Sequence, residues 1–218
     1  MKSLRVKICG ITKPEQGQAI AQMGATSLGF ICVPQSPRYV TPHQIRAVVD
    51  ALTIPVDRVG VFVDASLDTI ADTVAIANLS AIQLHGSESI AFCQQCRDRL
   101  PQIELIKAFR VRASATLQEA IAYADQVDTL LLDAYHPHLY GGTGQTLDWQ
   151  TLQRFQPACP WLLAGGLTPD NVLEAIRLAQ PHGVDLSSGV EQAAGDKDLS
   201  QVARLFAQLH TLRPSMVR

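Results

Sequence analysis

Two residues at the ends of strand-like segments have the chemistry to move protons. Cys9 ends the segment Arg5–Cys9, just before Gly10, and Asp133 ends the segment Thr129–Asp133 after three leucines. Side chains alternate along a strand, so Lys7 and Cys9 point the same way. A nearby ammonium favours the thiolate, and we expect the pKa of the Cys9 thiol to lie below its usual ~8.5. Apolar neighbours favour the protonated form of Asp133. This pattern predicts a general base at Cys9 and a general acid at Asp133.

Each of these two residues also has a purely structural interpretation. Buried cysteines often act only as small apolar side chains, and that alternative stays open for Cys9. An aspartate at the end of a strand is often a helix cap or a hydrogen-bonding loop residue, and that alternative stays open for Asp133.

Two glycine-containing loops are suited to a phosphate group. One contains Gly165 and Gly166, and the other contains Ser187, Ser188 and Gly189. Glycines let backbone N–H groups approach phosphate oxygens, and the serine hydroxyls add donors. We expect a turn of helix near residues 190–193 to direct its positive end at the anion. The alternative is two tight turns that need glycine only for their backbone conformation.

Arg38, within Ser36-Pro37-Arg38-Tyr39, adds a cation suited to bidentate pairing with a substrate carboxylate. Its alternative is an ordinary surface arginine. A base, an acid and a phosphate clamp together indicate proton transfer on a sugar phosphate. That chemistry needs no cofactor and no metal, and we predict neither.

The elements that must position these residues alternate between short strand-like runs and amphipathic segments. The runs are Arg5–Cys9, Ser27–Cys32, Arg58–Val63, Ala81–Leu84, Glu104–Phe109, Thr129–Asp133, Trp161–Ala164 and Val184–Ser187. Helix starts are expected at Thr12-Lys13-Pro14, Thr41-Pro42, Ser66-Leu67-Asp68, Ser87-Glu88 and Thr168-Pro169-Asp170, and a last helix over 198–212. Eight such units predict an α/β fold, a single (β/α)8 TIM barrel that occupies residues 1–218 as one domain. Active sites of such barrels lie at the C-terminal strand ends, where all the candidates above are found.

Composition excludes several classes of protein. The 218 residues carry 18 Lys plus Arg and 20 Asp plus Glu, so no basic excess is present to bind nucleic acid. No apolar stretch reaches the roughly 18 residues of a membrane span, and the N-terminus lacks the apolar segment of a signal peptide. We therefore predict a cytoplasmic protein that binds a small phosphosugar, neither nucleic acid nor membrane, and that is a monomer or homodimer. The five cysteines are an odd number, and Cys93-Gln94-Gln95-Cys96 is predicted to be two ordinary helical cysteines.

Motifs along nearly the whole chain resemble the phosphoribosylanthranilate isomerase family of tryptophan biosynthesis. They include Lys7-Ile8-Cys9-Gly10-Ile11-Thr12, Ser36-Pro37-Arg38-Tyr39-Val40, Gln83-Leu84-His85-Gly86, Gly141-Gly142-Thr143-Gly144, Gly165-Gly166-Leu167 and Asp185-Leu186-Ser187-Ser188-Gly189-Val190-Glu191. The resemblance implies an Amadori rearrangement of N-(5-phosphoribosyl)anthranilate to 1-(2-carboxyphenylamino)-1-deoxyribulose 5-phosphate. It implies that Asp133 protonates the ribose ring oxygen, that Cys9 removes the C2′ proton and that Arg38 faces the anthranilate carboxylate.

The same resemblance adds further candidates for substrate binding. These are His85, Gly142 and Gly144. His85 either hydrogen-bonds the substrate or holds its own loop, and both remain open. His136 and His138 in the loop after Asp133 are expected to face solvent rather than a metal.

Three other functions compete with this one. A histidine-pathway isomerase performs the same rearrangement on a different amine. The active site of that family has two aspartates, whereas the first strand here ends in Cys9. A non-catalytic phosphate-binding barrel would need neither Cys9 nor Asp133. A thiol redox module would need Cys93 and Cys96 exposed at a helix N-terminus.

Overall fold

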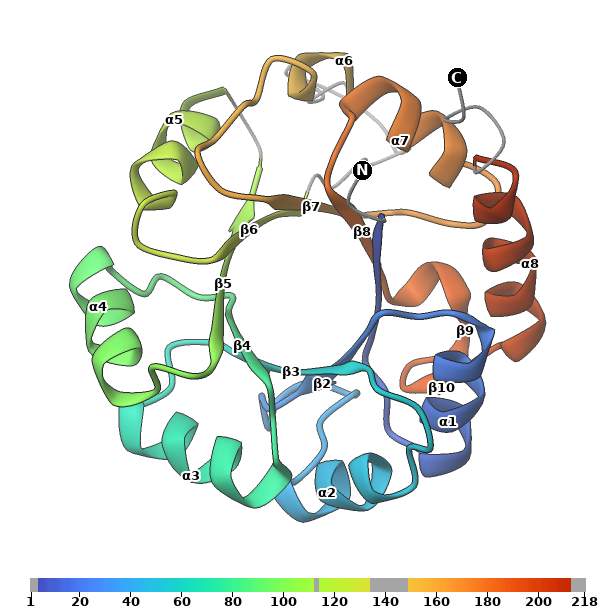
Figure 1. Cartoon of the computed structure of the whole chain (residues 1–218), viewed down its shortest axis with the longest axis horizontal. Helices are drawn as coiled ribbons and strands as arrows, with labels where there is room; N and C mark the ends of the chain where they lie inside the picture. The colour runs from blue at the N-terminus through green and yellow to red at the C-terminus, as the bar shows by residue number, and fades with distance from the viewer. Residues whose placement is uncertain (1–3, 112–113, 134–148, 213–218) are drawn as a thin grey trace.

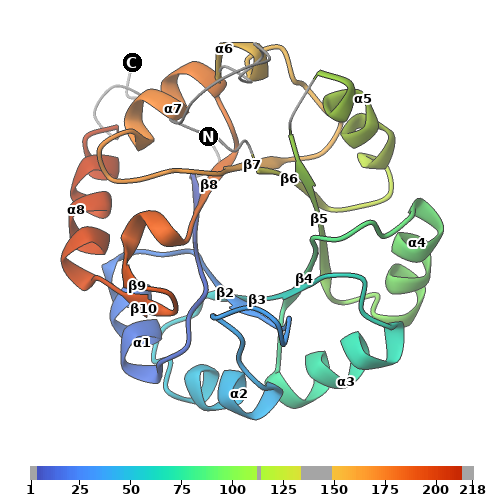
Figure 2. The ribbon, with the colours of Figure 1, turned by 180° about the vertical axis from the view of Figure 1, so that it is seen from behind.

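Eight parallel strands close into a barrel in the computed structural model, which describes residues 4–111, 114–133 and 149–212. In sequence order the barrel strands are β1 (Arg5–Cys9), β2 (Ser27–Ile31), β3 (Asp57–Phe62), β4 (Ala81–Leu84), β5 (Glu104–Arg110), β6 (Thr129–Asp133), β7 (Trp161–Ala164) and β8 (Gly183–Leu186). Each strand pairs with the next, and β8 pairs with β1, so the described barrel has no open edge. The predicted (β/α)8 TIM barrel is confirmed, and the closed ring is visible from both ends (Figures 1 and 2).

The helices form an outer ring around the strands (Figure 1). They are α1 (Pro14–Met23), α2 (Pro42–Asp50), α3 (Leu67–Ala77), α4 (Ile90–Arg99), α5 (Ser114–Tyr123), α6 (Trp149–Leu152), α7 (Val172–Ala179) and α8 (Leu199–His210). After β8 come the 3-10 helix η1 (Ser188–Val190) and a small antiparallel pair, β9 (Glu191–Ala193) and β10 (Asp196–Lys197). Among the described residues, no helix is long and apolar enough to cross a membrane.

The helix starts follow from local capping chemistry. Thr41 caps α2 in a capping box with Gln44, and the Ser66 and Asp198 side chains accept backbone N–H groups at the starts of α3 and α8. The expected start at Thr168 is wrong. The Asn171 side chain instead accepts the Thr168 N–H in a turn, and α7 begins after it.

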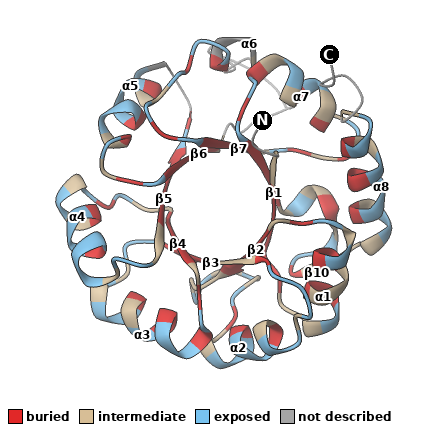
Figure 3. Cartoon of the chain, in the orientation of Figure 1, coloured by how far each residue is buried: buried red, intermediate tan, exposed pale blue. Residues whose placement is uncertain are grey.

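Apolar side chains form two separate cores. The larger lies between the strands and the helices and includes Val6 and Ile8 of β1. The smaller fills the inside of the barrel, with Val59, Ala81, Ile106, Ala108, Leu131, Leu162 and Ala164. Figure 3 shows the strands as buried and the outer sides of the helices as exposed. This division confirms that Lys7 and Cys9, opposite in direction to Val6 and Ile8, belong to the barrel interior.

Candidate active site

A cavity of about 370 Å³ opens at the C-terminal ends of the strands. It brings together residues that are far apart in sequence: Cys9, Arg38, His85, Asp133, Gly165, Gly166, Ser187, Ser188 and Gly189. The barrel alone explains this, because parallel strands end at the same rim. Every described residue that the sequence singled out for catalysis or binding therefore borders one cavity.

Cys9 lies beside a buried ion pair. The Lys7 Nζ atom is 2.9 Å from Asp185 Oδ2, and the exposed fractions of the two side chains are 0% and 9%. Lys7 and Asp185 are direct neighbours in the register of β1 and β8. The Cys9 side chain follows two residues along β1, on the same inner face, and is buried.

The expected lowering of the Cys9 pKa is wrong. Burial raises the pKa of the Cys9 thiol, and this effect outweighs the opposing charges of Lys7 and Lys197. The negative charge of Asp185 raises it further. The expectation failed first because it left out the burial of the thiol, and second because it counted the Lys7 ammonium without the carboxylate that is paired with it.

Asp133 faces a histidine whose orientation is set by its own strand. The Asp133 Oδ2 atom lies 3.7 Å from His85 Nε2, and Asp133 keeps 29% of its side chain exposed, so it is only partly removed from water. His85 Nδ1 lies 3.0 Å from the Gln83 side-chain nitrogen. With the amide placed this way, Gln83 donates to Nδ1, and the neutral ring carries its proton on Nε2. Within the described part of the chain, this buried Nε2 has no hydrogen-bond partner. In this tautomer, an N–H donor of His85 is directed toward Asp133.

The two glycine loops meet on one side of the cavity. Gly165 and Gly166 both have positive φ, 94° and 63°, so this turn after β7 requires glycine. The helical turn expected near residues 190–193 is instead the three-residue η1 over Ser188–Val190, followed by a strand. Ser187 Oγ donates to the Cys9 carbonyl oxygen at 3.1 Å, which ties the loop after β8 to the end of β1.

Arg38 is held by a carboxylate of the protein. Its Nε and Nη2 atoms contact both oxygens of Glu191, with the shortest distance 2.6 Å from Nη2 to Oε2. Lys197 Nζ donates to the same carboxylate at 2.7 Å and is fully buried. Burial alone would raise the pKa of Glu191, but the hydrogen bonds from Arg38 and Lys197 lower it. Arg38 is therefore a fixed cation rather than a mobile surface side chain.

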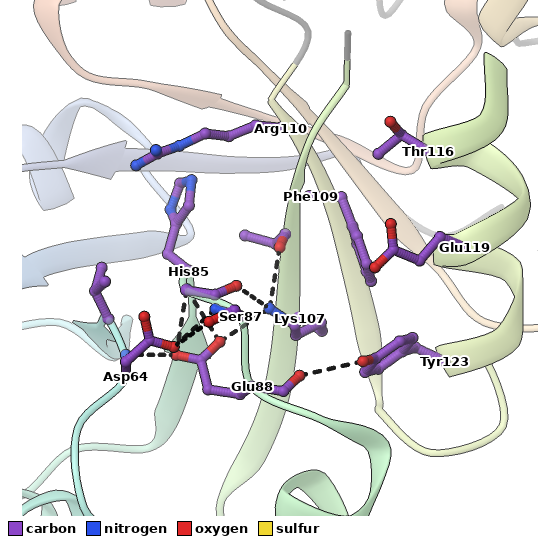
Figure 4. Close-up of a pocket in the computed structure, with 13 residues that line it drawn as sticks. Asp64, His85, Ser87, Glu88, Lys107, Phe109, Arg110, Thr116, Glu119 and Tyr123 are labelled. Carbon is purple, nitrogen blue, oxygen red and sulfur yellow. Dashed lines mark hydrogen bonds and ion pairs between the residues drawn. The ribbon is translucent and has the colours of Figure 1, made fainter. Parts of the chain in front are cut away.

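His85 also borders a second cavity of about 470 Å³, whose lining residues are drawn in Figure 4. Its floor is a buried ion pair, with Lys107 Nζ 2.9 Å from Glu88 Oε2 and both side chains 3% exposed. Glu88 also accepts the backbone N–H groups of Asp64 and Gly86. Figure 4 shows the Arg110 side chain extending above the His85 ring. This network ties together the loops after β3 and β4, from which His85 projects.

Some predicted residues are not part of this picture. Gly142, Gly144, His136 and His138 lie outside the described residues. Cys93 and Cys96 are in the middle of α4 and are buried, so the exposed pair that a redox module requires is not present.

Sequence reasoning missed four residues that organise the site. Gln83, Asp185, Glu191 and Lys197 were given no role. Alternation along β8 places Asp185 inside the barrel and was a usable signal. Nothing local indicates that Glu191 contacts Arg38, which lies 153 positions earlier, or that Lys197 donates to the same carboxylate.

Comparison with known proteins agrees with the site. The model of a family described as N-(5'phosphoribosyl)anthranilate (PRA) isomerase matches residues 6–208. The chain belongs to this family. The family carries the isomerase activity of tryptophan biosynthesis that its name describes, which decides against a histidine-pathway isomerase and a silent phosphate-binding barrel.

Individual phosphoribosylanthranilate isomerases support the same conclusion. An N-(5'-phosphoribosyl)anthranilate isomerase of Rippkaea orientalis is 60% identical over 206 residues, which cover 94% of this chain and 96% of the relative. The crystal structure of the phosphoribosyl anthranilate isomerase of Thermotoga maritima is 37% identical, with a TM-score of 0.84, covering 96% of this chain and 100% of that one. Another isomerase structure, in complex with reduced 1-(o-carboxyphenylamino)-1-deoxyribulose 5-phosphate, is 35% identical with a TM-score of 0.82 and the same coverage.

Proposed function

We propose that this phosphoribosylanthranilate isomerase works with Asp133 as its general acid and Cys9 as its general base. Asp133 donates a proton to the ribose ring oxygen, the C1′–O bond breaks, and the nitrogen lone pair forms the Schiff base. The Cys9 thiolate then takes the C2′ proton, which gives the enolamine, and tautomerisation gives the ketone. The observation that carries this proposal is that both groups border one cavity with the two phosphate-type loops.

Other residues of the cavity support separate binding sites for the two ends of the substrate. We assign the phosphate to the backbone of Gly165, Gly166, Ser188 and Gly189, with Gly142 and Gly144 as further candidates outside the described residues. Ser187 belongs to the same loop, and its hydroxyl ties the loop to the end of β1 by donating to the Cys9 carbonyl oxygen. The anthranilate carboxylate is assigned to Arg38, through the guanidinium nitrogen that does not contact Glu191. Its N–H groups are suited to a carboxylate because Glu191 fixes the plane of the guanidinium.

His85 completes the proposed set as a substrate-binding donor. Its Nε2 atom lies 3.7 Å from Asp133 Oδ2, and a bond to substrate would give this buried nitrogen the hydrogen-bond partner that it lacks among the described residues. The whole chain, residues 1–218, acts in this proposal as one cytoplasmic catalytic domain, and the oligomeric state stays a prediction of monomer or homodimer.

The test follows the loss of anthranilate fluorescence when phosphoribosylanthranilate is generated in situ. Cys9→Ala and Asp133→Asn are each expected to lower kcat by at least about 10²-fold, because each removes one proton-transfer group. The matched control is Cys93→Ala, which changes a buried cysteine of α4 away from the cavity. Near-normal turnover in Cys9→Ala or Asp133→Asn would remove that residue from its role.

A further inference from the structure

Asp185 of β8 lies next to Lys7 in the register of β1 and β8, on the inner face of the barrel, and borders the substrate cavity. One of its oxygens, Oδ2, accepts from Lys7. The other, Oδ1, is buried, and within residues 4–111, 114–133 and 149–212 it has no hydrogen-bond partner. A buried carboxylate oxygen without a donor costs stability, and such atoms call for a functional explanation.

We propose that Asp185 sets the protonation of Cys9, by neutralising the Lys7 ammonium so that the sulfur rests as a thiol and is a strong base once it loses its proton. This rests on the proposed role of Cys9 as the general base. Asp185 acts through Lys7 and is therefore a positioning residue, not a catalytic one.

Charge balance in the interior is the first argument. Lys7 is fully buried, and Asp185 is about nine-tenths buried. A buried ammonium needs one negative partner, and Asp185 supplies it at 2.9 Å. With that partner present, a thiolate at Cys9 would add a buried negative charge that Lys7 no longer balances. Without it, the thiolate would itself become the partner of Lys7.

The other groups around Cys9 stay the same when Lys7 or Asp185 is replaced. Lys197 from β10 and Arg38 from the loop after β2 are both cations that share the single carboxylate of Glu191, and the charge of Lys197 lowers the pKa of Cys9. Cys32 follows β2, and burial raises the pKa of its thiol to about 12, so it carries no charge. His85 and Asp133 border the same cavity from β4 and β6. Of the described groups, Lys7 and Asp185 are the pair that lies next to Cys9 on the inner face of β1 and β8.

A strong base is useful for the proposed step. Proton transfer from carbon is faster when the base has a higher proton affinity, provided that enough of it is deprotonated at the working pH. A Cys9 paired directly with Lys7 would be deprotonated more often but would be a weaker base. The arrangement with Asp185 thus favours base strength over thiolate population.

The experiment measures the titration of Cys9 in the whole protein by iodoacetamide alkylation. The rate at the peptide that contains Cys9 is followed by mass spectrometry as a function of pH, which separates Cys9 from the other four cysteines. Asp185→Asn is expected to move the midpoint down by about one pH unit or more, and Lys7→Met to move it up. The rising limb of kcat/KM against pH is expected to move in the same two directions, with a lower plateau in Asp185→Asn.

A matched control and a second variant keep the test decisive. Glu88→Gln removes the carboxylate of an equally buried lysine pair across the barrel and should leave the Cys9 midpoint unchanged. If either single variant fails to fold, Lys7→Met with Asp185→Leu replaces the pair by apolar side chains, which proteins often tolerate. Its midpoint is expected to lie at or above that of the wild type. An unchanged or raised midpoint in Asp185→Asn, or a lowered one in the double variant, would overturn the proposal.

The outcome is separate from that of the proposed function. Full activity in Cys9→Ala would refute the role of Cys9 as base while leaving the alkylation midpoints to report on Asp185. Opposite shifts in the two single variants, together with loss of activity in Cys9→Ala, support both.

Discussion

The position of Arg38 depends on residues that never touch the substrate in the proposed assignment. Glu191 contacts two of its guanidinium nitrogens, and Lys197 holds the other side of Glu191 while donating to the Ser187 carbonyl oxygen at 3.3 Å. The residue assigned to the anthranilate carboxylate is thus connected to the loop assigned to the phosphate. In the proposed assignment, the two ends of one substrate are therefore bound by a single hydrogen-bonded unit.

Replacement of this carboxylate tests the connection. Glu191→Gln is expected to raise KM about 10-fold with a smaller change in kcat, because loss of a charge-assisted hydrogen bond costs roughly 1.5–3 kcal/mol and frees Arg38 to leave its position. Steady-state kinetics of the isomerisation measure the two constants. Lys13→Gln is the control, since it breaks an ion pair to Asp196 at the same small β9–β10 pair without touching Arg38. Equal effects of the two substitutions would contradict the connection.

At the scale of the elements, the two ends of the barrel strands carry different kinds of charge network. Opposite to the active site, Arg5 at the start of β1 reaches Glu104 of β5 at 2.8 Å and Asp57 of β3 at 3.0 Å. Thr129 of β6 donates to Glu104 as well. These contacts join four strands across the interior at their N-terminal ends. Residues at this end of such a barrel are expected to stabilise the fold rather than to take part in the reaction.

This network predicts a change in stability without a change in catalysis. Glu104→Gln is expected to lower the free energy of unfolding by about 2 kcal/mol, from the loss of charge-assisted hydrogen bonds, and to leave kcat and KM unchanged. Burial alone would raise the pKa of Glu104, but its bonds to Arg5 lower it. The stabilisation is therefore complete above the ordinary value of ~4.3 and is lost as pH falls through the lower value in the folded protein.

Urea unfolding across this pH range gives the measurement. The difference between wild type and Glu104→Gln should be present at neutral pH and disappear in acid. Arg46→Gln, at the exposed Arg46–Asp50 pair on α2, should change stability by no more than about 0.5 kcal/mol. A pH-independent difference for Glu104→Gln would show that packing, not charge, is responsible.

The elements also show how far sequence patterns reach. Alternation along β1 and the leucine run before Asp133 were sufficient to place both at the rim, since these are properties of a single strand. The predicted direction of the Cys9 pKa was wrong because the pKa depends first on burial inside the closed barrel and then on Asp185, which is 176 positions away in sequence but adjacent to Lys7 in the barrel. The predicted start of α7 was wrong because Thr168 and Asn171 close a turn through the bond from the Thr168 N–H to the Asn171 side chain, and the helix begins only after this turn. Patterns within one segment predict where an element lies and which way its side chains point. The balance of buried charges depends on which strands pair with each other.

At the scale of the whole molecule, the meeting of β1 and β8 decides the site. It places Lys7 opposite Asp185, joins Ser187 to Cys9, and brings residues from the two ends of the chain into one cavity. At the start of β8, Gly183 is closely flanked by β1 and β7. A Cβ atom there would overlap the Arg5 carbonyl oxygen and would lie 2.7 Å from Leu162 Cδ2. Backbone cannot give way as a flexible side chain can, so this position admits no side chain without moving a strand.

Closure of the barrel is therefore expected to fail first at this glycine. Gly183→Ala should lower stability by about 2–3 kcal/mol, the upper part of the usual cost of overpacking, and Tm by about 5–10 °C for a chain of this size. Gly24→Ala is the comparison, because Gly24 ends α1 with φ 116° but has only ordinary contacts, so its cost should be near 1 kcal/mol. Hydrogen exchange locates the damage. The Arg5 and His182 amides, which bond across the β1, β8 and β7 junction, should lose protection in Gly183→Ala, while the Ser80-bonded amide of Glu104 keeps it. If Gly183→Ala costs no more than Gly24→Ala, or exchange rises evenly around the barrel, the crowding at this junction does not limit closure.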